Sequence, residues 1–201
     1  QADDWVRLRK HDYNWVKVRQ NARLAREGFE RDNRAMNEWQ KHRHGESMLY
    51  GDNIAAGSES YDVWRPQNAA AHCYPFHVLT ASLTDREMLQ GAMTEMLESE
   101  ISHTSRYLGD ERLILPDVWN IASQEFESPE ADIHQITHGV SQYCKEGLMP
   151  VSEWMGTNSP WFDRMKSITD YLWERQLKGK TDLGDSIIMA AVVIYARPNV
   201  E

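Results

Sequence analysis

The segment 84–108 spaces its apolar side chains three and four residues apart, as on one face of a helix. Two polar residues, Glu100 and His103, fall in the same series. The full series is Leu89, Met93, Met96, Glu100, His103 and Tyr107. Because residues three apart share a helix face, Glu100 and His103 are predicted to point together into the interior. A buried carboxylate needs a pairing group, a proton or a cation, so we expect a partner for Glu100.

Helix signals dominate the chain, and strand signals are almost absent. We find no turn dipeptide between alternating runs and no glycine-rich phosphate loop. Caps, prolines and periodicity predict seven helices, at about 3–43, 66–82, 84–108, 116–128, 128–147, 159–178 and 181–198. The second is expected to bend at Pro75. The sequence therefore predicts an all-α protein, a helical bundle with a long N-terminal helix.

Three parts are expected along the chain: an N-terminal basic helix or arm at 1–44, a loop at 45–66 and a helical bundle domain at 67–201. The loop is rich in Gly, Ser, Asp and Asn and is more than 20 residues long, so we expect it to wrap around or bind something.

Two further details concern the second half of the chain. In the helix expected at 128–147, Ser128 is the predicted cap, Pro129 the first turn and Gly147 the stop, with a loop following at 149–159. In the last helix, the run Ile187–Ala196 has no polar face. We therefore expect that helix to be central in the bundle.

Composition limits the classes of protein that this chain can be. Its 201 residues suffice for one large domain with a real core or two small ones. No run of 18 apolar residues exists, so no membrane span is predicted. Two cysteines, Cys73 and Cys144, are too few for a disulfide framework and indicate buried thiols, hence the cytoplasm or another reducing compartment. The chain begins at Gln1, so we expect a processed or trimmed N-terminus and leave targeting open.

Charge is unevenly distributed. Residues 1–44 contain 11 Lys and Arg against 7 Asp and Glu, a net charge of +4, and the other 157 residues carry −13. An acidic body argues against a nucleic-acid-binding domain. The basic helix carries Trp5, Trp15 and Trp39, and large aromatic residues often anchor interfaces. We therefore expect other protein subunits, in a hetero- or homo-oligomer, to bind through residues 1–44.

Three groups of residues could hold a metal ion. Glu100 and His103 suit iron, manganese or zinc, and in ferritin-like bundles inward Glu-x-x-His motifs hold two irons or manganeses. His134 and His138 lie four residues apart and could chelate a divalent ion, or could equally form a polar surface ridge. His72, Cys73 and His77 could also chelate, although Pro75 separates them. For each group, ordinary pairing with polar neighbours remains the alternative.

The sequence Glu100-Ile-Ser-His103-Thr resembles the first Glu-x-x-His motif of the large hydroxylase subunit of bacterial multicomponent monooxygenases. The segments 161–166 and 182–193 resemble the helix pair that follows it there, and a similar pair occurs in the smaller, metal-free hydroxylase subunit. The resemblance implies a ferritin-like fold with a di-iron centre, in which Glu100 is a bridging or terminal iron ligand and His103 an iron ligand. The family's next glutamate would fall in the last, apolar helix, and its second Glu-x-x-His has no counterpart here.

Two functions are expected from these observations. The first is a subunit of a carboxylate-bridged di-metal oxidase or oxygenase, a hydroxylase-like oxidoreductase that would use iron to activate dioxygen. The second is a non-catalytic structural subunit of a larger complex, attached through its N-terminal helix.

Overall fold

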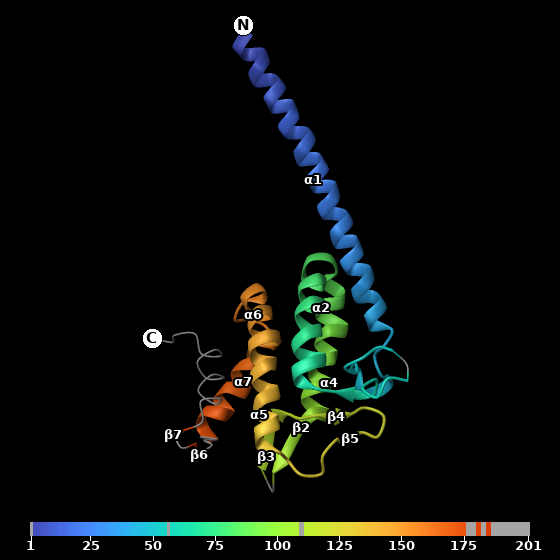
Figure 1. The fold of residues 1–201 in the computed structure, drawn as a ribbon, viewed down its shortest axis with the longest axis vertical. Coiled ribbons are helices and arrows are strands. Elements are labelled where there is room, and N and C mark those ends of the chain that lie inside the picture. Colours follow the sequence, from blue (N-terminus) through green and yellow to red (C-terminus); the bar gives the residue numbers. More distant parts are fainter. Residues whose placement is uncertain (1, 56, 109–110, 176–179, 182–183, 186–201) are drawn as a thin grey trace.

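A computed structural model describes residues 2–55, 57–108, 111–175, 180–181 and 184–185 of the chain. These residues are predominantly helical, as the sequence predicts. One long helix projects from a compact body, whose helices lie side by side above a group of short strands (Figure 1). None of the described helices is both long and apolar enough to cross a membrane.

The projecting helix is α1, Ala2–Gln40. It contains no proline and is rich in Arg, Ala, Gln and Glu, which favour helix. Its last turns pack against α2 (Ala71–Thr84) through Met36, which is fully buried, and Trp39. Residues 14–26 are exposed all round. The long N-terminal helix predicted from the sequence is therefore confirmed, and its C-terminal turns pack against the body.

The body is formed by two groups of helices. The first comprises the π-helical turn η2 (Pro66–Ala70), α2, α3 (Arg86–Met88), η3 (Leu89–Met93) and α4 (Thr94–Thr104). The second comprises α5 (Ile133–Gln142), η4 (Tyr143–Leu148), α6 (Met149–Met155) and α7 (Pro160–Arg175). Their shared core includes Tyr74, Val78, Met93, Met96, Val140, Leu148, Trp161 and Ile168.

Short antiparallel strands occupy the lower end of the body. β2 (Ser105–Leu108) pairs with β3 (Glu111–Pro116), and β1 (Val63–Trp64), β4 (Trp119–Asn120) and β5 (Glu125–Phe126) form a sheet in the order β1-β4-β5. A further pair joins β6 (Lys180–Thr181) to β7 (Gly184–Asp185).

The helix predicted at 116–128 is therefore wrong. The reversal between β4 and β5 places Gln124 at φ 56°, a left-handed conformation that no helix interior can contain. Trp119 of β4 is buried and pairs with Trp64 of β1. Short apolar runs leave the choice between helix and strand to tertiary contacts, and here the contact with β1 decides it.

Other predicted boundaries also shift. The helix predicted at 84–108 ends at Thr104, after which the chain enters β2. The helix predicted from Ser128 begins at Ile133, because the carboxylate of Asp132 accepts hydrogen bonds from the backbone N–H groups of His134 and Gln135.

Gly147 does not stop this helix, and 149–159 is not a loop, since α6 continues to Met155. A Cβ at Gly147 would lie 3.1 Å from the Cα of Ala71. The glycine therefore allows η4 to approach α2 closely, a packing role that is indistinguishable from a helix stop in the sequence.

The helix predicted at 159–178 is observed as α7, although residues 176–178 are not described. The start of the helix predicted at 181–198 is not observed, because Thr181 lies in β6 and Gly184 in β7. Its apolar run at 187–196 lies outside the described residues.

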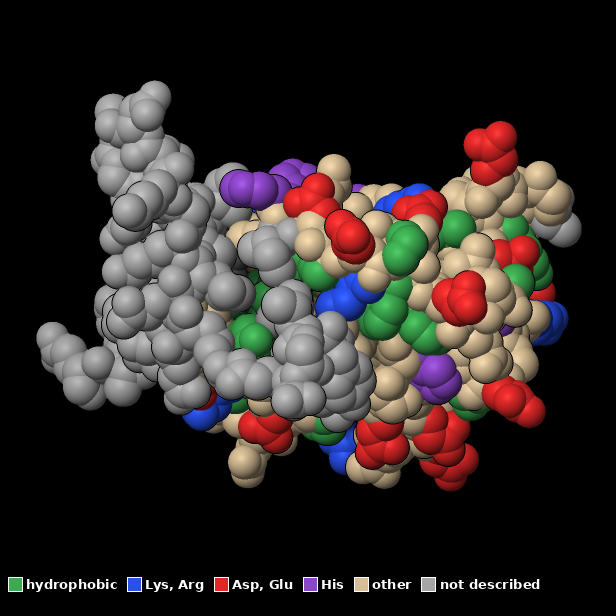
Figure 2. Space-filling view, turned by 90° about the horizontal axis from the view of Figure 1, so that it is seen from below, with side chains coloured by type: hydrophobic (Ala, Val, Ile, Leu, Met, Phe, Trp, Pro, Cys, Tyr) green, Lys and Arg blue, Asp and Glu red, His purple; other side chains and the backbone are tan. Residues whose placement is uncertain are grey.

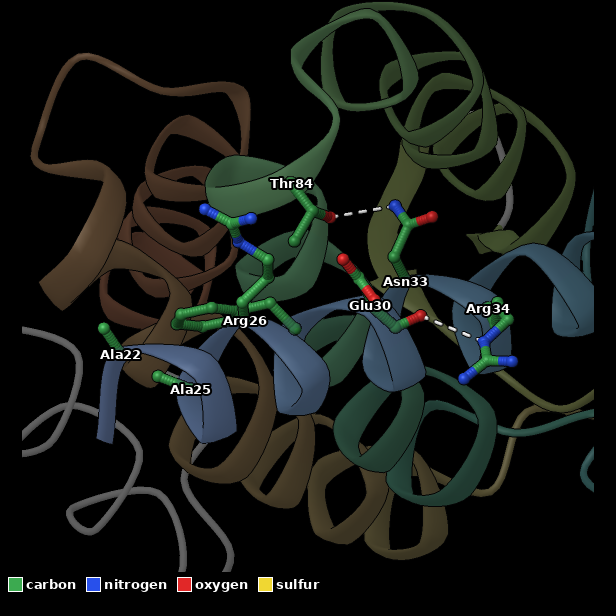
Figure 3. A pocket seen from close by; sticks show the side chains of 8 residues that line it. Ala22, Ala25, Arg26, Glu30, Asn33, Arg34 and Thr84 are labelled. Carbon is green, nitrogen blue, oxygen red and sulfur yellow. Dashed lines mark hydrogen bonds between the residues drawn. The ribbon is translucent and has the colours of Figure 1, made fainter. Parts of the chain in front are cut away.

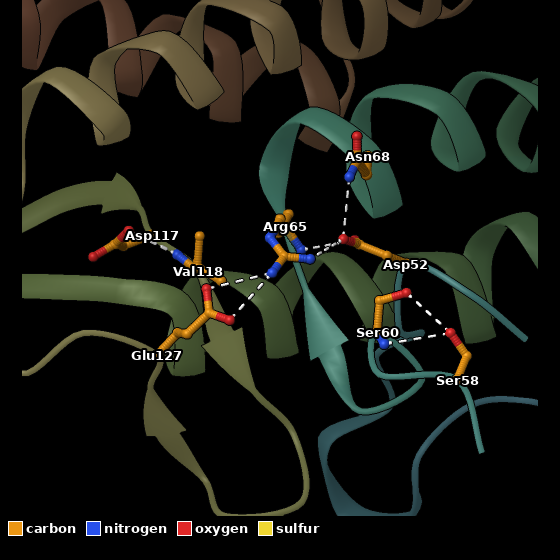
Figure 4. Close-up of polar contacts among 8 residues, drawn as sticks. All are labelled: Asp52, Ser58, Ser60, Arg65, Asn68, Asp117, Val118 and Glu127. Atoms are coloured by element: carbon orange, nitrogen blue, oxygen red, sulfur yellow. Dashed lines mark hydrogen bonds and ion pairs between the residues drawn. The ribbon is translucent and has the colours of Figure 1, made fainter. Parts of the chain in front are cut away.

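The segment 45–66 packs against the body of its own chain. Leu49, Tyr50 and Trp64 are buried in the core. Figure 4 shows the hydrogen bonds that hold this segment: the Arg65 guanidinium donates to Asp52 at 2.6 Å and to Glu127 at 3.1 Å. The Asn68 amide also donates to Asp52, at 3.1 Å.

Candidate functional site

A buried ion pair lies at the centre of the body. Glu100 of α4 is fully buried, and its Oε1 accepts hydrogen bonds from the Nη2 and Nε of Arg164 on α7, at 3.2 and 3.3 Å. Its Oε2 accepts a 2.7 Å hydrogen bond from the Tyr143 hydroxyl of η4. Three elements thus meet at one carboxylate, which is inward-facing and paired, as predicted.

Burial and pairing act in opposite directions on this carboxylate. Burial raises the pKa of Glu100 above its usual value, and the Arg164 guanidinium and the Tyr143 hydroxyl partly offset that rise. The same burial raises the pKa of Tyr143 and Tyr74 well above the usual value for a phenol. It raises the pKa of the Cys144 thiol to about 12. The phenols and the thiol therefore stay protonated at neutral pH.

Tyr74 completes the surroundings of the carboxylate. Its ring packs edge-on against that of Tyr143, with 6.0 Å between centroids. Its hydroxyl is close enough to influence the pKa of Glu100, yet it makes no well-aligned hydrogen bond among the described residues. We regard it as a weak contact beside the stronger pair of donors.

His103 does not share the environment of Glu100. Its Nδ1 lies 2.8 Å from the backbone oxygen of Ser99 and 3.1 Å from the Ser102 hydroxyl, and its ring contacts Trp119 at 6.0 Å between centroids. The imidazole is half-buried at the edge of the bundle. The expectation that Glu100 and His103 point together is therefore wrong: residues three apart differ by about 60° around a helix, enough here to separate core from rim.

His134 and His138 lie on the exposed side of α5, whereas Ile136 and Val140 are buried on the other side. The two imidazoles form a polar ridge on the surface. Among the described residues, no group of three or more His, Cys, Asp or Glu side chains is arranged to hold a metal ion. Metal binding at this ridge stays a prediction.

The described residues around Glu100 do not fit a di-iron centre. Both carboxylate oxygens are already hydrogen-bonded, one of them to a guanidinium. A cation placed there would face the fixed positive charge of Arg164 across a buried, weakly screened distance. A carboxylate-bridged centre needs several carboxylates, and the neighbours that contact Glu100 are instead Arg164 and Tyr143.

A second buried titratable group lies between α1, α2 and the segment 45–66. His77 is 1% exposed, and rings of Trp39, Tyr50 and Phe76 surround it at 5.2–5.7 Å. Burial lowers the pKa of His77 to about 4, so the ring is neutral at pH 7. Beside it, burial raises the pKa of Cys73 to about 11. A protonated thiol next to a neutral imidazole is not an activated nucleophile.

The partners of Glu100 were not predicted from the sequence, although a signal for one of them exists. Arg164 lies three residues after Trp161 and four before Ile168, both buried residues of α7. A charged residue in such an apolar series indicates a buried ion pair in the same way that Glu100 does. Tyr143 gives no comparable signal, because tyrosine is common on half-buried helix faces.

Among the residues whose side chains are described, five of the eight exposed large hydrophobic side chains lie on α1. Trp15, Val16, Val18, Leu24 and Phe29 are each 46–63% exposed. Where α1 leaves the body, a hollow of about 860 Å³ opens beside Thr84 at the end of α2. Figure 3 shows it, with Ala22 and Ala25 on its floor and the Asn33 amide donating to the Thr84 hydroxyl at 2.9 Å.

Comparison of the whole chain with protein-family models, with curated proteins and with solved structures gave no match.

Proposed function

We propose that this chain is a non-catalytic structural subunit of a larger protein complex and that α1 attaches it there. The observation that carries the proposal is the exposure of apolar side chains on α1. An isolated helix gains little stability from propensity alone and relies on packing. Clustered exposed apolar side chains are typical of interaction sites.

The buried centre of the body supports a structural role. Glu100 is held by Arg164 and Tyr143, all three nearly inaccessible to solvent. A buried, hydrogen-bonded cluster of this kind joins three helical elements, α4, η4 and α7. The di-metal oxidase function, its ferritin-like bundle and its iron cofactor remain predictions from the sequence, and this geometry does not favour them.

Charge supports attachment through α1 as well. The segment 1–44 carries +4 and the remaining residues −13. Acidic side chains are spread over the described part of the face that contains the strands (Figure 2). A basic arm on an acidic body is suited to steering the arm toward acidic surfaces of other proteins.

The test is isolation of the tagged 201-residue chain from its native source under gentle conditions. We expect it to elute with other proteins in fixed ratio and without stoichiometric iron or manganese. The doubly substituted variant Val18→Asp/Phe29→Asp should elute alone while its unfolding midpoint stays unchanged. Recovery of the intact chain alone would refute the proposal, and stoichiometric metal in the isolated chain would favour the oxidase instead.

A further inference from the structure

One face of α1 carries a line of apolar residues with the spacing of a coiled-coil seam. Steps of three and four residues alternate along it, giving Trp15, Val18, Ala22, Ala25, Phe29, Asp32, Met36 and Trp39. Only Asp32 interrupts the apolar series. Repetition of this kind over three to four heptads is typical of a helix that packs lengthwise against another helix.

The C-terminal end of this line is already packed. Met36 is fully buried against α2, and Trp39 lies edge-on to Tyr50 and His77. The N-terminal end is not packed in the same way, since Val18 is 53% and Phe29 46% exposed. On a straight α-helix a line of three- and four-residue steps drifts by about 20° per heptad, so the face that packs in the core continues outward beyond the body while turning slowly around α1.

The exposed stretch also has the shape that helix packing requires. Its two middle positions, Ala22 and Ala25, are small, and with Phe29 and Thr84 they line the 860 Å³ hollow (Figure 3). Small residues let helix axes approach to about 8 Å. We call Trp15, Val18, Ala22, Ala25 and Phe29 the α1 seam.

Charge selects the kind of helix that fits. The stretch 14–26 contains four basic residues, Lys17, Arg19, Arg23 and Arg26, and no acidic one. Arg19 and Arg26 directly follow seam positions, where residues of paired helices face each other across the interface. A second copy of α1 packed along the seam would bring one stretch of charge +4 close to another of the same sign, which is unfavourable.

We propose that the α1 seam binds an amphipathic helix of a partner protein whose apolar line is flanked by acidic residues. The proposal rests on the proposed function and names the chemistry of the partner. The partner's apolar residues fill the hollow over Ala22 and Ala25, and its carboxylates pair with Arg19 and Arg26. The partner thereby extends the contact that Met36 begins.

The test uses the intact 201-residue chain and two labelled synthetic helical peptides of about three heptads. Both have Leu at the seam positions, but one carries Glu and the other Lys at the flanking positions. Fluorescence anisotropy should show the Glu peptide binding at least about tenfold more tightly than the Lys peptide. Raising the salt concentration should reduce that difference.

Two variants with matched changes locate the contact. Val18→Asp/Phe29→Asp alters the seam, and Val16→Asp/Leu24→Asp alters somewhat more exposed apolar positions off the seam line. Both add two negative charges to the same helix. The seam variant should lose at least about tenfold in affinity for the Glu peptide, while the off-seam variant should stay within about threefold of the unaltered chain.

Three outcomes would overturn the proposal: equal binding of the two peptides, equal effects of the two variants, or a chain whose seam is already occupied.

Micromolar self-association that the seam variant abolishes would identify a second copy as the occupant. Binding to anionic phospholipid vesicles that excludes the Glu peptide would identify a membrane surface. If both peptides fail while the native complex persists, the partner's chemistry is wrong and the structural role stands. If the chain is isolated alone, the structural role itself fails.

Discussion

The Glu100 cluster and the α1 seam are opposites in one respect. Both carboxylate oxygens of Glu100 accept hydrogen bonds from side chains of the same chain, in a region closed to solvent. Along the seam, apolar side chains that would be buried in most proteins remain near half exposed. A buried and hydrogen-bonded interior indicates stability, whereas an exposed apolar surface indicates binding. The four predictions below test that contrast.

The largest effect is expected at the buried ion pair. Arg164→Met should lower the free energy of unfolding by about 3–5 kcal/mol, because it leaves the buried Glu100 carboxylate without its cation. Urea denaturation of the variant measures this directly. Lys166→Met is the matched control on the same helix: its pair with Asp170 is exposed, so at most about 1 kcal/mol should be lost.

The double variant Glu100→Leu/Arg164→Met should be less destabilised than Arg164→Met alone, since neither charge is then stranded. Equal losses in the Arg164 and Lys166 variants would show that the buried pair contributes no more than a surface pair.

A second prediction compares two residues seven positions apart on one face of α1. Met36→Ala should cost about 2–5 kcal/mol, because it opens a cavity in a fully buried position. Phe29→Ala should change stability by less than about 0.5 kcal/mol, since its ring is half exposed. Thermal unfolding of the isolated chain distinguishes them. A large loss for Phe29→Ala would mean that the seam is already packed.

The third prediction concerns pH. The pKa of His77 is lowered by burial to about 4, against about 6.5 in an unfolded chain. Between pH 4 and pH 6.5 the imidazole binds a proton in the unfolded state but stays neutral in the folded state. The free energy of unfolding is therefore highest above pH 6.5 and decreases as the pH falls toward 4. The expected loss is about 3 kcal/mol.

The variant His77→Phe keeps an aromatic ring at this position. Its free energy of unfolding should depend much less on pH between pH 4 and pH 6.5. The variant His138→Phe, altered at an exposed imidazole, should retain the profile of the unaltered chain. Identical pH profiles for the His77 variant and the unaltered chain would contradict a buried, neutral imidazole.

The smallest effect is expected at His103. Since its imidazole contacts Ser99 and Ser102 rather than Glu100, His103→Leu should cost less than about 1 kcal/mol. The comparison with Arg164→Met by urea denaturation is decisive. If the His103 variant lost as much as the Arg164 variant, the imidazole would be a partner of the carboxylate after all.

Agreement between the predicted and the observed helices differs along the chain for identifiable reasons. Composition rich in helix-favouring residues predicted α1, and apolar residues three and four apart predicted α7, because each signal extends over several turns. Periodicity is weaker in short segments. It failed at 116–128, where strands of two residues contain too little periodicity to be recognised. It also misread Gly147, because a glycine required for close packing and a glycine that ends a helix are identical in sequence.

Likewise, only part of the candidate site could be predicted from the sequence. The apolar series through 84–108 predicted that Glu100 is buried and paired, and the structure confirms both. The identity of the partner could not be predicted, because Arg164 is 64 residues away and only the packing of α7 against α4 brings it near. Spacing along one helix suggested His103 instead, which the structure places at the rim.

The sequence by itself therefore determined the helical character, the basic arm on an acidic body and the need of one buried carboxylate for a partner. These follow from local periodicity and from charge, which depend only on the order of residues. The tertiary structure decided which cation meets that carboxylate, where helices give way to strands and how far the apolar face of α1 extends beyond the core. Those depend on contacts between distant segments, which no local pattern encodes.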